Sequence, residues 1–323
     1  MTPEPEKDLP PLPSLEVLQE AMQKLAAAAR IDPVLDSADP SEVIRQVPGK
    51  RVILRGLLGI RPAYFRITLD DSKACEREWT ELKRVWGYMN TGSALVCEPF
   101  ACVPEHGVMA VSEVQGTPLY KYLYQLAPKE RVSWLRPCAD WLRVYTGPTQ
   151  TLGPCNPKRW IARAERGANN QAFKDLKSLE QEILIELKRL VVKISNTTGR
   201  NAICHGDFHA NNLIVNDQIL TGVDCGGSKP MPIYKDIARF LMHLGRRGMI
   251  PSGDRYLGVD ARGFEIFADT FEMTAPERKL ILPFFLGVEA LIRTETRDLS
   301  ASRIRRAKEM SKSLLSDLKT IAA

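Results

Sequence analysis

The sequence predicts an α+β fold in two lobes, a small antiparallel-sheet lobe with one helix followed by a larger, mostly helical lobe. Three observations lead to this prediction. Short runs of alternating apolar and polar residues, separated by turn residues, fill positions 43–114. Helical spacing of apolar residues dominates after Gly116. A chain of 323 residues is also long enough to form two lobes of unequal size.

Residues 1–42 are expected to form an N-terminal tail and helix outside these lobes. The opening segment MTPEPEKDLPPLPS is rich in proline, which predicts an extended or disordered tail. Apolar spacing and alanine content predict a helix in LEVLQEAMQKLAAAAR, residues 15–30. We expect the ordered core to begin after this helix.

Residues 43–114 are expected to form the small lobe. The segments VIRQ, RVILRG and AYFRITL, joined by turns at 48–50 and around Gly59, predict a three-stranded meander whose first strand starts near Ile44. Residues 71–88 predict a helix, with Asp70, Asp71 and Ser72 as candidate N-caps. ALVCEPFACV and GVMAVSEV predict two further strands.

Residues 115–323 are expected to form the larger lobe. Apolar periodicity predicts helices over 120–145, 157–166, 173–195 and 275–320. One β interruption is expected, beginning in the segment AICHGDFHANNLIV of residues 202–215. Turn residues Asn216 and Asp217 follow it, and QILTGV completes a hairpin that carries Asp224 at its far end.

Composition restricts the class of protein. The apolar share of 44% and the charged share of 26% are those of an ordinary globular chain. The formal net charge of +6 is spread along the sequence, which favours an anionic ligand such as a nucleotide and gives no sign of a nucleic-acid partner. The 7 cysteines form no C-x-x-C pair, and no run approaches the roughly 18 apolar residues of a membrane span. With no secretory signal recognised at the N-terminus, we expect a cytoplasmic protein without a membrane partner.

The loop before the hairpin concentrates polar side chains. His205, Asp207, His209 and Asn212 lie in it, and the hairpin is expected to return Asp224 towards it. Two carboxylates and an amide oxygen suit Mg²⁺, and a spare carboxylate can deprotonate a hydroxyl, so the set fits phosphoryl transfer. Two other interpretations are loop-capping acids and a zinc site, although zinc would require a third nitrogen or sulfur ligand at a suitable spacing.

Three ordered motifs carry a family resemblance. HGDFHANN, VDCGG and YKDIARF are similar to motifs of the aminoglycoside phosphotransferase and choline kinase group, which are protein-kinase-like small-molecule kinases. The resemblance covers roughly Ile44 to the C-terminus. It implies that Asp207 is the catalytic base and that Asn212 and Asp224 hold the Mg²⁺ ions that bridge the phosphates of ATP or GTP. It further implies that His205 and Asp236 brace the catalytic loop.

The resemblance also assigns the nucleotide half of the site to the small lobe. Glu78 matches the helix glutamate of the family, whereas Arg66 stands where the family has a strand lysine. The phosphate loop holds only Gly49, with Lys50 and Arg51 beside it, and backbone groups near Ser112, Glu113 and Val114 would bind adenine. The alternative for Arg66 and Glu78 is a surface ion pair without function.

The expected acceptor is a small molecule with a hydroxyl group. A polycationic aminoglycoside would need a site lined with carboxylates, and the C-terminal helices supply acids and arginines together. An aminoglycoside, an amino alcohol and a sugar-like metabolite therefore all stay open. Because of Arg66 and the sparse phosphate loop, the alternative function is a nucleotide-binding pseudokinase with a regulatory or interaction role. The residues that define the mixed charge are Glu265, Asp269, Glu272, Glu289, Glu295, Asp298, Arg293, Arg297, Arg303, Arg305 and Arg306.

Overall fold

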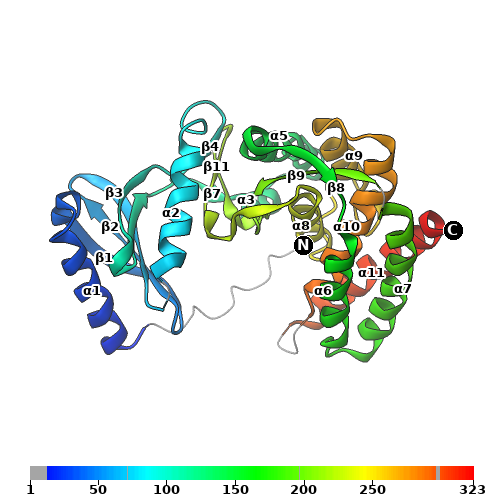
Figure 1. Cartoon of the computed structure of the whole chain (residues 1–323), viewed down its shortest axis with the longest axis horizontal. Coiled ribbons are helices and arrows are strands. Elements are labelled where there is room, and N and C mark those ends of the chain that lie inside the picture. Colours follow the sequence, from blue (N-terminus) through cyan, green and yellow to red (C-terminus); the bar gives the residue numbers. More distant parts are fainter. Residues whose placement is uncertain (1–12, 71, 196, 296–298) are drawn as a thin grey trace. The chain divides into compact units, whose positions relative to one another are not determined.

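The computed structural model describes residues 13–70, 72–195, 197–295 and 299–323. Contacts divide the chain into two compact units (Figure 1): unit 1 is Met1–Thr117 with Leu213–Ser228, and unit 2 is Pro118–Asn212 with Lys229–Ala323. The expected proline-rich tail and the candidate N-cap Asp71 lie outside the described residues, as do Arg297 and Asp298.

Unit 1 is built on a five-stranded antiparallel sheet in the order β1-β2-β3-β6-β5. The first strand starts at Ala38 rather than near Ile44, because an edge strand with register shifts tolerates Pro40. The single strand expected over 94–103 is two strands, and β4 (Ala94–Val96) joins a different sheet. The strands of the main sheet are β1 (Ala38–Val47), β2 (Arg51–Leu58), β3 (Arg61–Thr68), β5 (Pro99–Val103) and β6 (Val108–Ser112).

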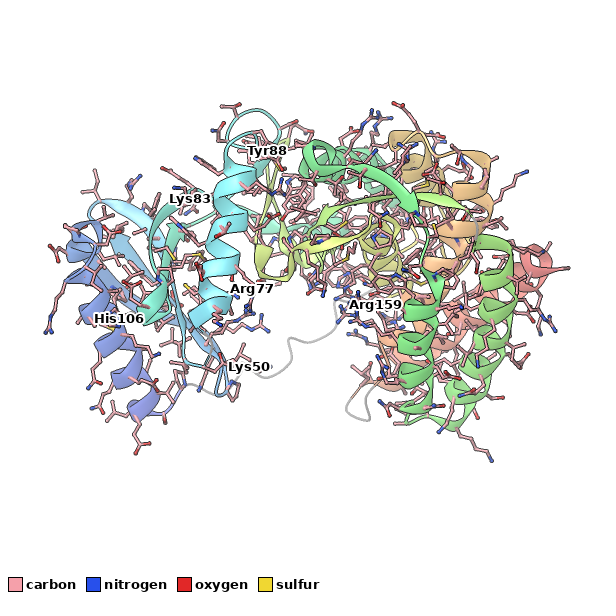
Figure 2. All side chains as sticks on the ribbon, viewed as in Figure 1. Lys50, Arg77, Lys83, Tyr88, His106 and Arg159 are labelled. Atoms are coloured by element: carbon pink, nitrogen blue, oxygen red, sulfur yellow. The ribbon has the colours of Figure 1, made fainter. Side chains whose placement is uncertain are left out.

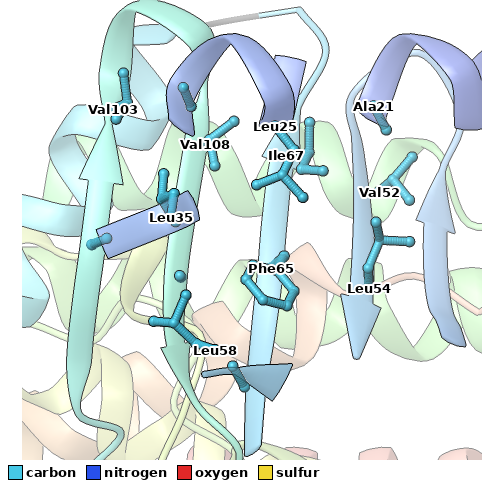
Figure 3. Close-up of a cluster of buried hydrophobic side chains, with 14 residues drawn as sticks. Ala21, Leu25, Leu35, Val52, Leu54, Leu58, Phe65, Ile67, Val103 and Val108 are labelled. Atoms are coloured by element: carbon cyan, nitrogen blue, oxygen red, sulfur yellow. The ribbon is translucent and has the colours of Figure 1, made fainter. Parts of the chain in front are cut away.

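The N-terminal helix belongs to the core of unit 1, and the expectation that the ordered core begins after it is wrong. Helix α1 (Leu15–Ala29) and the short 3₁₀ helix η1 (Pro33–Ser37) cover one face of the sheet, as the close-up in Figure 3 shows. Buried Ala21, Leu25 and Leu35 pack against side chains of the sheet. The helix therefore buries apolar surface that the sheet would otherwise expose. The sheet residues of this cluster are Val52, Leu54, Leu58, Ala63, Phe65, Ile67, Ala101, Val103, Val108 and Ala110.

Helix α2 (Ser72–Trp86) lies on the opposite face of the sheet. Phe65 and Ile67 of β3 point into the α1 cluster, so Arg66 between them points towards α2. The sequence alternation of this strand thus decides which side chain meets the helix. Figure 2 shows Arg77 and Lys83 projecting from α2 and Lys50 at the turn between β1 and β2.

The hairpin also belongs to unit 1, although the sequence places it within the large lobe. Strands β10 (Leu213–Asn216) and β11 (Ile219–Gly222) pair with each other, and β11 runs parallel to β4. The sheet order is β4-β11-β10-β7, where β7 is Thr117–Pro118. Gly116 has φ +134°, and a Cβ there would lie 2.2 Å from the Val215 carbonyl oxygen. The close approach of these backbones therefore requires glycine.

Unit 2 is mostly helical, with an antiparallel sheet of β8 (Thr151–Pro154), β9 (Thr198–Cys204) and β12 (Lys229–Pro232) that the sequence did not predict. The helix expected over 120–145 is three helices, and Pro128 starts the second of them. The helix expected over 275–320 is interrupted after Ile292. The helices are α3 (Leu119–Gln125), α4 (Pro128–Ser133), α5 (Leu135–Thr146), α6 (Pro157–Asn169), α7 (Lys174–Ile194), α8 (Tyr234–Gly245), α9 (Ala261–Thr270), the π-helical turn Glu277–Ile281, α10 (Leu282–Ile292) and α11 (Ala301–Ala322).

Both units contain cysteine thiols, and the described helices contain no membrane span. Six thiols are buried and Cys102 is half-buried. Burial raises the pKa of Cys97 to about 12. Within the described residues, no helix combines the length and the apolar character needed to cross a bilayer. Unit 1 holds Cys75, Cys97, Cys102 and Cys225, and unit 2 holds Cys138, Cys155 and Cys204.

Candidate active site

The loop that carries the HGD motif starts where β9 leaves the sheet of unit 2. The ring of buried His205 lies 6.0 Å from that of Trp141 and 5.7 Å from that of Tyr145. Gly206 has φ +84°, and its N–H donates to both carboxylate oxygens of Asp236, at 3.1 and 3.2 Å. Asp236 is fully buried in the first turn of α8, and burial raises its pKa. His205 and Asp236 thus both contact the start of the loop.

Asp207 is surrounded by positively charged side chains of unit 2. Its Oδ1 accepts hydrogen bonds from Arg239 Nε at 2.8 Å and from Arg293 Nη2 at 3.1 Å. Its Oδ2 lies 3.4 Å from His209 Nε2. Burial raises the pKa of this carboxyl, but the hydrogen bond from His209 and the charge of Arg239 outweigh burial and hold the pKa well below its usual range. The group is therefore ionised at neutral pH while 38% of the side chain stays exposed.

Asn212 closes the same loop. Its Nδ2 donates to the Asp207 carbonyl oxygen at 3.0 Å, and its backbone N–H donates to the His209 carbonyl at 2.8 Å. Phe208, between them in the chain, is fully buried, and its ring stacks on Trp141 at 5.5 Å. Since the amide nitrogen is bonded inward, the side-chain oxygen is the atom that could bind a cation.

Glu289 of α10 holds in place the two arginines that contact Asp207. Its side chain has no exposed surface, and its carboxylate lies 2.5 Å from Lys235 Nζ, 3.3 Å from Arg293 Nε and 3.7 Å from Arg239 Nε. Burial raises its pKa, but the three cations outweigh burial and lower it. One buried carboxylate therefore orients the cations that face the candidate base.

The second group of site residues lies in unit 1, around Asp224. The hairpin register pairs Leu213 with Gly222, so the chain enters at Asn212 and leaves towards Asp224 at the same end. Asp224 has φ +64°. Its Oδ1 lies 3.1 Å from Arg66 Nη1, and its Oδ2 lies 3.8 Å from Arg51 Nη2. Two guanidinium groups thus contact the carboxylate.

Arg66 also forms an ion pair with Glu78 of α2. The side chains are 15% and 6% exposed, so this is a buried pair and the surface interpretation is wrong. Burial raises the pKa of Glu78 to about 7, although the Arg66 charge opposes the rise. A Cβ on Gly226 would lie 2.8 Å from the Glu78 Oε2, so the DCGG segment packs directly against this pair.

The other residues expected to bind nucleotide are dispersed over unit 1. Gly49 has φ +65° in the β1–β2 turn, next to exposed Lys50. The backbone N–H of Glu113 donates to the Pro62 carbonyl at 3.0 Å, and its carboxylate pairs with Arg55 at 2.8 Å. The N–H of Ser112 likewise donates within the sheet, to the Glu98 carbonyl at 2.9 Å. Adenine would therefore have to use other backbone groups, such as those of Val114.

Sequence reasoning missed three charged residues that contact the candidate groups, namely Arg239, Arg293 and Glu289. Arg51 was expected to meet the phosphates from the turn, and only its contact with Asp224 was not foreseen. Arg239 lies inside the quoted YKDIARF motif, three residues after Asp236. That spacing places both on one side of α8 and could have identified Arg239. Glu289 and Arg293 resembled part of a solvent-exposed helix surface.

The acidic residues of the C-terminal helices are paired rather than arranged as a lining for a cation. Glu272 pairs with Arg143 at 2.9 Å, and Glu295 pairs with Arg246 at 2.6 Å. Glu265 and Asp269 both bind Arg278. Each carboxylate in this set that the structure describes therefore already has a cationic partner.

The model of the phosphotransferase enzyme family (APH) matches residues 51–274. No curated protein matches the chain. A solved choline/ethanolamine kinase family protein from Mesorhizobium loti is 13% identical, with a TM-score of 0.55 over 93% of this chain and 99% of that chain. The amicoumacin kinase hAmiN, solved with AMP-PNP, Ca²⁺ and Ami, is 13% identical, with a TM-score of 0.54 over 94% and 96%.

A further solved structure is the ternary complex of aminoglycoside phosphotransferase APH(2")-IIa with streptomycin and ATP. It is 12% identical, with a TM-score of 0.51 over 96% of this chain and 99% of that chain. At such identities the likeness concerns the fold. It confirms the protein-kinase-like α+β fold that the sequence predicts.

Proposed function

Because the chain belongs to the phosphotransferase enzyme family and is a small-molecule kinase, we propose that it transfers the γ-phosphoryl group of ATP or GTP to a hydroxyl of its acceptor. The observation that carries the proposal is Asp207, an ionised and partly exposed carboxylate at the centre of the HGD loop. Phosphoryl transfer depends mainly on positioning and on neutralising charge, and a fixed carboxylate can orient the attacking hydroxyl and accept its proton.

Mg²⁺ fits the donor atoms of the motif residues. Asn212 turns its amide nitrogen inward, which leaves its side-chain oxygen for a cation, and the carboxylate side chain of Asp224 is 34% exposed. Carboxylate and amide oxygens are hard ligands, and such a site keeps positions for phosphate oxygens. We therefore assign Asn212 and Asp224 to Mg²⁺, which when bound would neutralise the phosphate charge.

We assign the donor phosphates to the cations of unit 1. Arg66 is held by Glu78, and its planar guanidinium can bind phosphate in a bidentate manner. Lys50 in the β1–β2 turn and Arg51 beside it supply further positive charge. We retain Gly49 and Val114 as backbone contacts of the nucleotide, and His205 and Asp236 as supports of the loop.

An acceptor screen with a matched pair of variants tests the proposal. Purified protein would be assayed for acceptor-dependent release of ADP from Mg-ATP and of GDP from Mg-GTP over aminoglycosides, amino alcohols, sugars and metabolite hydroxyls. We expect Asp207→Asn to lower kcat by about 10²–10⁴ with an unchanged circular dichroism spectrum. Asp140→Asn, which removes an exposed carboxylate from the same unit, should leave kcat unchanged. Full turnover in Asp207→Asn would refute the assignment.

The rival function is a nucleotide-binding pseudokinase, which the Arg66 and Arg51 contacts with Asp224 favour. A carboxylate whose oxygens already contact two guanidinium groups would not bind the metal in such a protein. Thermal shift titration separates the two functions, since a ligand stabilises the state that it binds. Stabilisation by ATP that requires Mg²⁺ supports the kinase, whereas equal stabilisation with and without Mg²⁺ supports the rival.

A further inference from the structure

A basic cavity lies beside Asp207 within unit 2. Its volume is about 260 Å³, and residues of α8, α10, the segment after α10 and the start of α11 line it. Arg239 and Arg293, which both bind the Asp207 carboxylate, form part of its wall. Two residues of the cavity wall therefore contact the candidate base directly. The described part of its wall has five arginines, which are Arg239, Arg246, Arg247, Arg293 and Arg303.

The acids in the wall do not balance this charge. Glu295 pairs with Arg246 at 2.6 Å, which accounts for one arginine. Glu289, the other acid, already has Lys235 at 2.5 Å in addition to its two arginines. Among the residues that the structure describes, the cavity and its immediate supports thus hold more cations than anions.

Arg247 and Arg303 have no carboxylate within ion-pair distance among the residues that the structure describes. Within the described residues, Arg247 donates to the His243 carbonyl at 3.0 Å and lies over the Tyr120 ring. The Nε of Arg303 is buried without a hydrogen-bond partner in the described chain. Burial and the charge of Arg303 lower the pKa of Arg247 to about 10, which shows that the two cations repel each other.

His243 adds an unsatisfied polar atom to the same wall. Its side chain is 2% exposed, its ring stacks on that of His209 at 4.7 Å, and its Nδ1 has no partner in the described part of the chain. Burial first, and then the neighbouring arginines, lower its pKa well below the usual value. A buried polar group and two cations with no carboxylate partner in the described chain, all facing one cavity, are costly unless a ligand satisfies them.

We propose that this cavity binds an anionic group of the acceptor, so that the substrate is a small hydroxy compound carrying a carboxylate or a phosphate. Arginine binds either group through paired N–H donors. The acceptor hydroxyl oxygen forms the new bond to the γ-phosphorus, and the bond from that phosphorus to the β–γ bridging oxygen breaks. Asp207 takes the hydroxyl proton as the nucleoside diphosphate, ADP or GDP, leaves. The inference rests on the proposed function for this step alone.

The same features disfavour a polycationic acceptor. A polycation in this cavity would meet like charges and no unpaired acid of the described residues. The volume is also below the roughly 300–1,000 Å³ of sites for drug-sized ligands, so a compact metabolite fits better than a multi-ring aminoglycoside. The acceptor site is therefore opposite in charge to one built for aminoglycosides.

Binding to the full-length protein, measured without nucleotide, tests the cavity separately from catalysis. The probes are glycerate for the carboxylate, glycerol 3-phosphate for the phosphate, glycerol as the neutral analogue and kanamycin as the cation. We expect one or both anions to raise the Tm of the protein. Their affinity should fall as the NaCl concentration rises from 50 to 500 mM, because added salt shortens the Debye length over which charges interact, which is ~10 Å at ~0.1 M. Glycerol and kanamycin should not bind in this cavity.

The variant Arg303→Gln has a matched control on the same helix. Arg303→Gln should weaken anion binding by about tenfold to a hundredfold, the usual effect of losing a hydrogen bond to a charged group. Arg305→Gln removes an exposed arginine of α11 and should leave binding unchanged. The ligand-free Tm of Arg303→Gln should be equal to or higher than that of the natural chain, because the substitution relieves the repulsion between the two cations. If Arg303 had a merely structural role, the substitution would lower the ligand-free Tm.

The outcomes separate this inference from the proposed function. ADP release driven by anionic hydroxy compounds, with KM rather than kcat changed in Arg303→Gln, supports both. Phosphorylation of a cationic acceptor but of no anionic one overturns the inference and leaves the proposed function standing. Anion binding that depends on Arg303, without ADP release from any acceptor, supports the cavity and refutes the kinase reaction. Equal effects of Arg303→Gln and Arg305→Gln overturn the inference.

Discussion

Glu289→Gln should destabilise unit 2 by about 3–5 kcal/mol, the range found when one partner of a buried ion pair is removed. The carboxylate has no exposed surface and lies 2.5 Å from the ammonium of Lys235, whose side chain is 4% exposed. The variant leaves that ammonium buried without its counterion, and Arg239 and Arg293 lose the same partner. Three cations lose a partner, so we expect a value in the upper half of the range.

The measurement is urea unfolding of the natural chain and the variant, with equal m-values required before midpoints are compared. Glu182→Gln is the control, because its partner Lys319 lies at 3.0 Å but the two side chains are 47% and 54% exposed, which limits the effect to about 0–1 kcal/mol. Because folding lowers the pKa of Glu289, the stability that its carboxylate contributes is fully present above the unfolded-state pKa. This stability is lost as the pH falls through the folded-state pKa. Equal losses in the two variants at pH 7 would refute the role given to Glu289.

Two further predictions concern unit 1. Because burial raises the pKa of Glu78 from 4.5 to about 7, the folded state binds a proton that the unfolded state releases, and stability falls as pH rises between these values. Glu78→Gln should therefore gain roughly 3 kcal/mol relative to the natural chain between pH 4 and pH 8 in urea unfolding, and a relative loss would show that the Arg66 charge dominates. Gly226→Ala should lower the free energy of unfolding by about 1–3 kcal/mol and weaken ATP binding, because the added Cβ would lie 2.8 Å from Glu78. Gly147→Ala is the control, because its Cβ would have nothing within 4 Å, and it should leave nucleotide affinity unchanged. Equal ATP affinities in the two variants would contradict the packing argument.

The local parts of the site could be predicted from the sequence. The HGD loop, the hairpin after it and the strand position of Arg66 follow from residue order and period. The contact of Asp207 with Arg293 could not be predicted, because it joins residues far apart in the chain and no quoted motif contains Arg293. Periodicity shows which face of a helix is polar but does not show what that face meets.

The fold has the same division between local and long-range information. The helix over 15–30 was predicted by its apolar spacing and alanine content, yet its packing on the sheet depends on buried residues of four strands that no local pattern connects to it. The hairpin was predicted by its turn, but its place in unit 1 depends on the pairing of β11 with β4. The sheet of β8, β9 and β12 was missed because its strands are short and separated by long helices.

The cysteines of both units can serve as native probes of local unfolding. Each unit holds at least three thiols, six of the seven are buried, and each lies at a different place in the chain. A buried thiol reacts with a soluble alkylating reagent only when its surroundings open, so its modification rate reports the free energy of that opening. Mass spectrometry of the labelled peptides would therefore give separate opening energies for unit 1 and unit 2 without any introduced probe. Ligands assigned to one unit should slow labelling in that unit first.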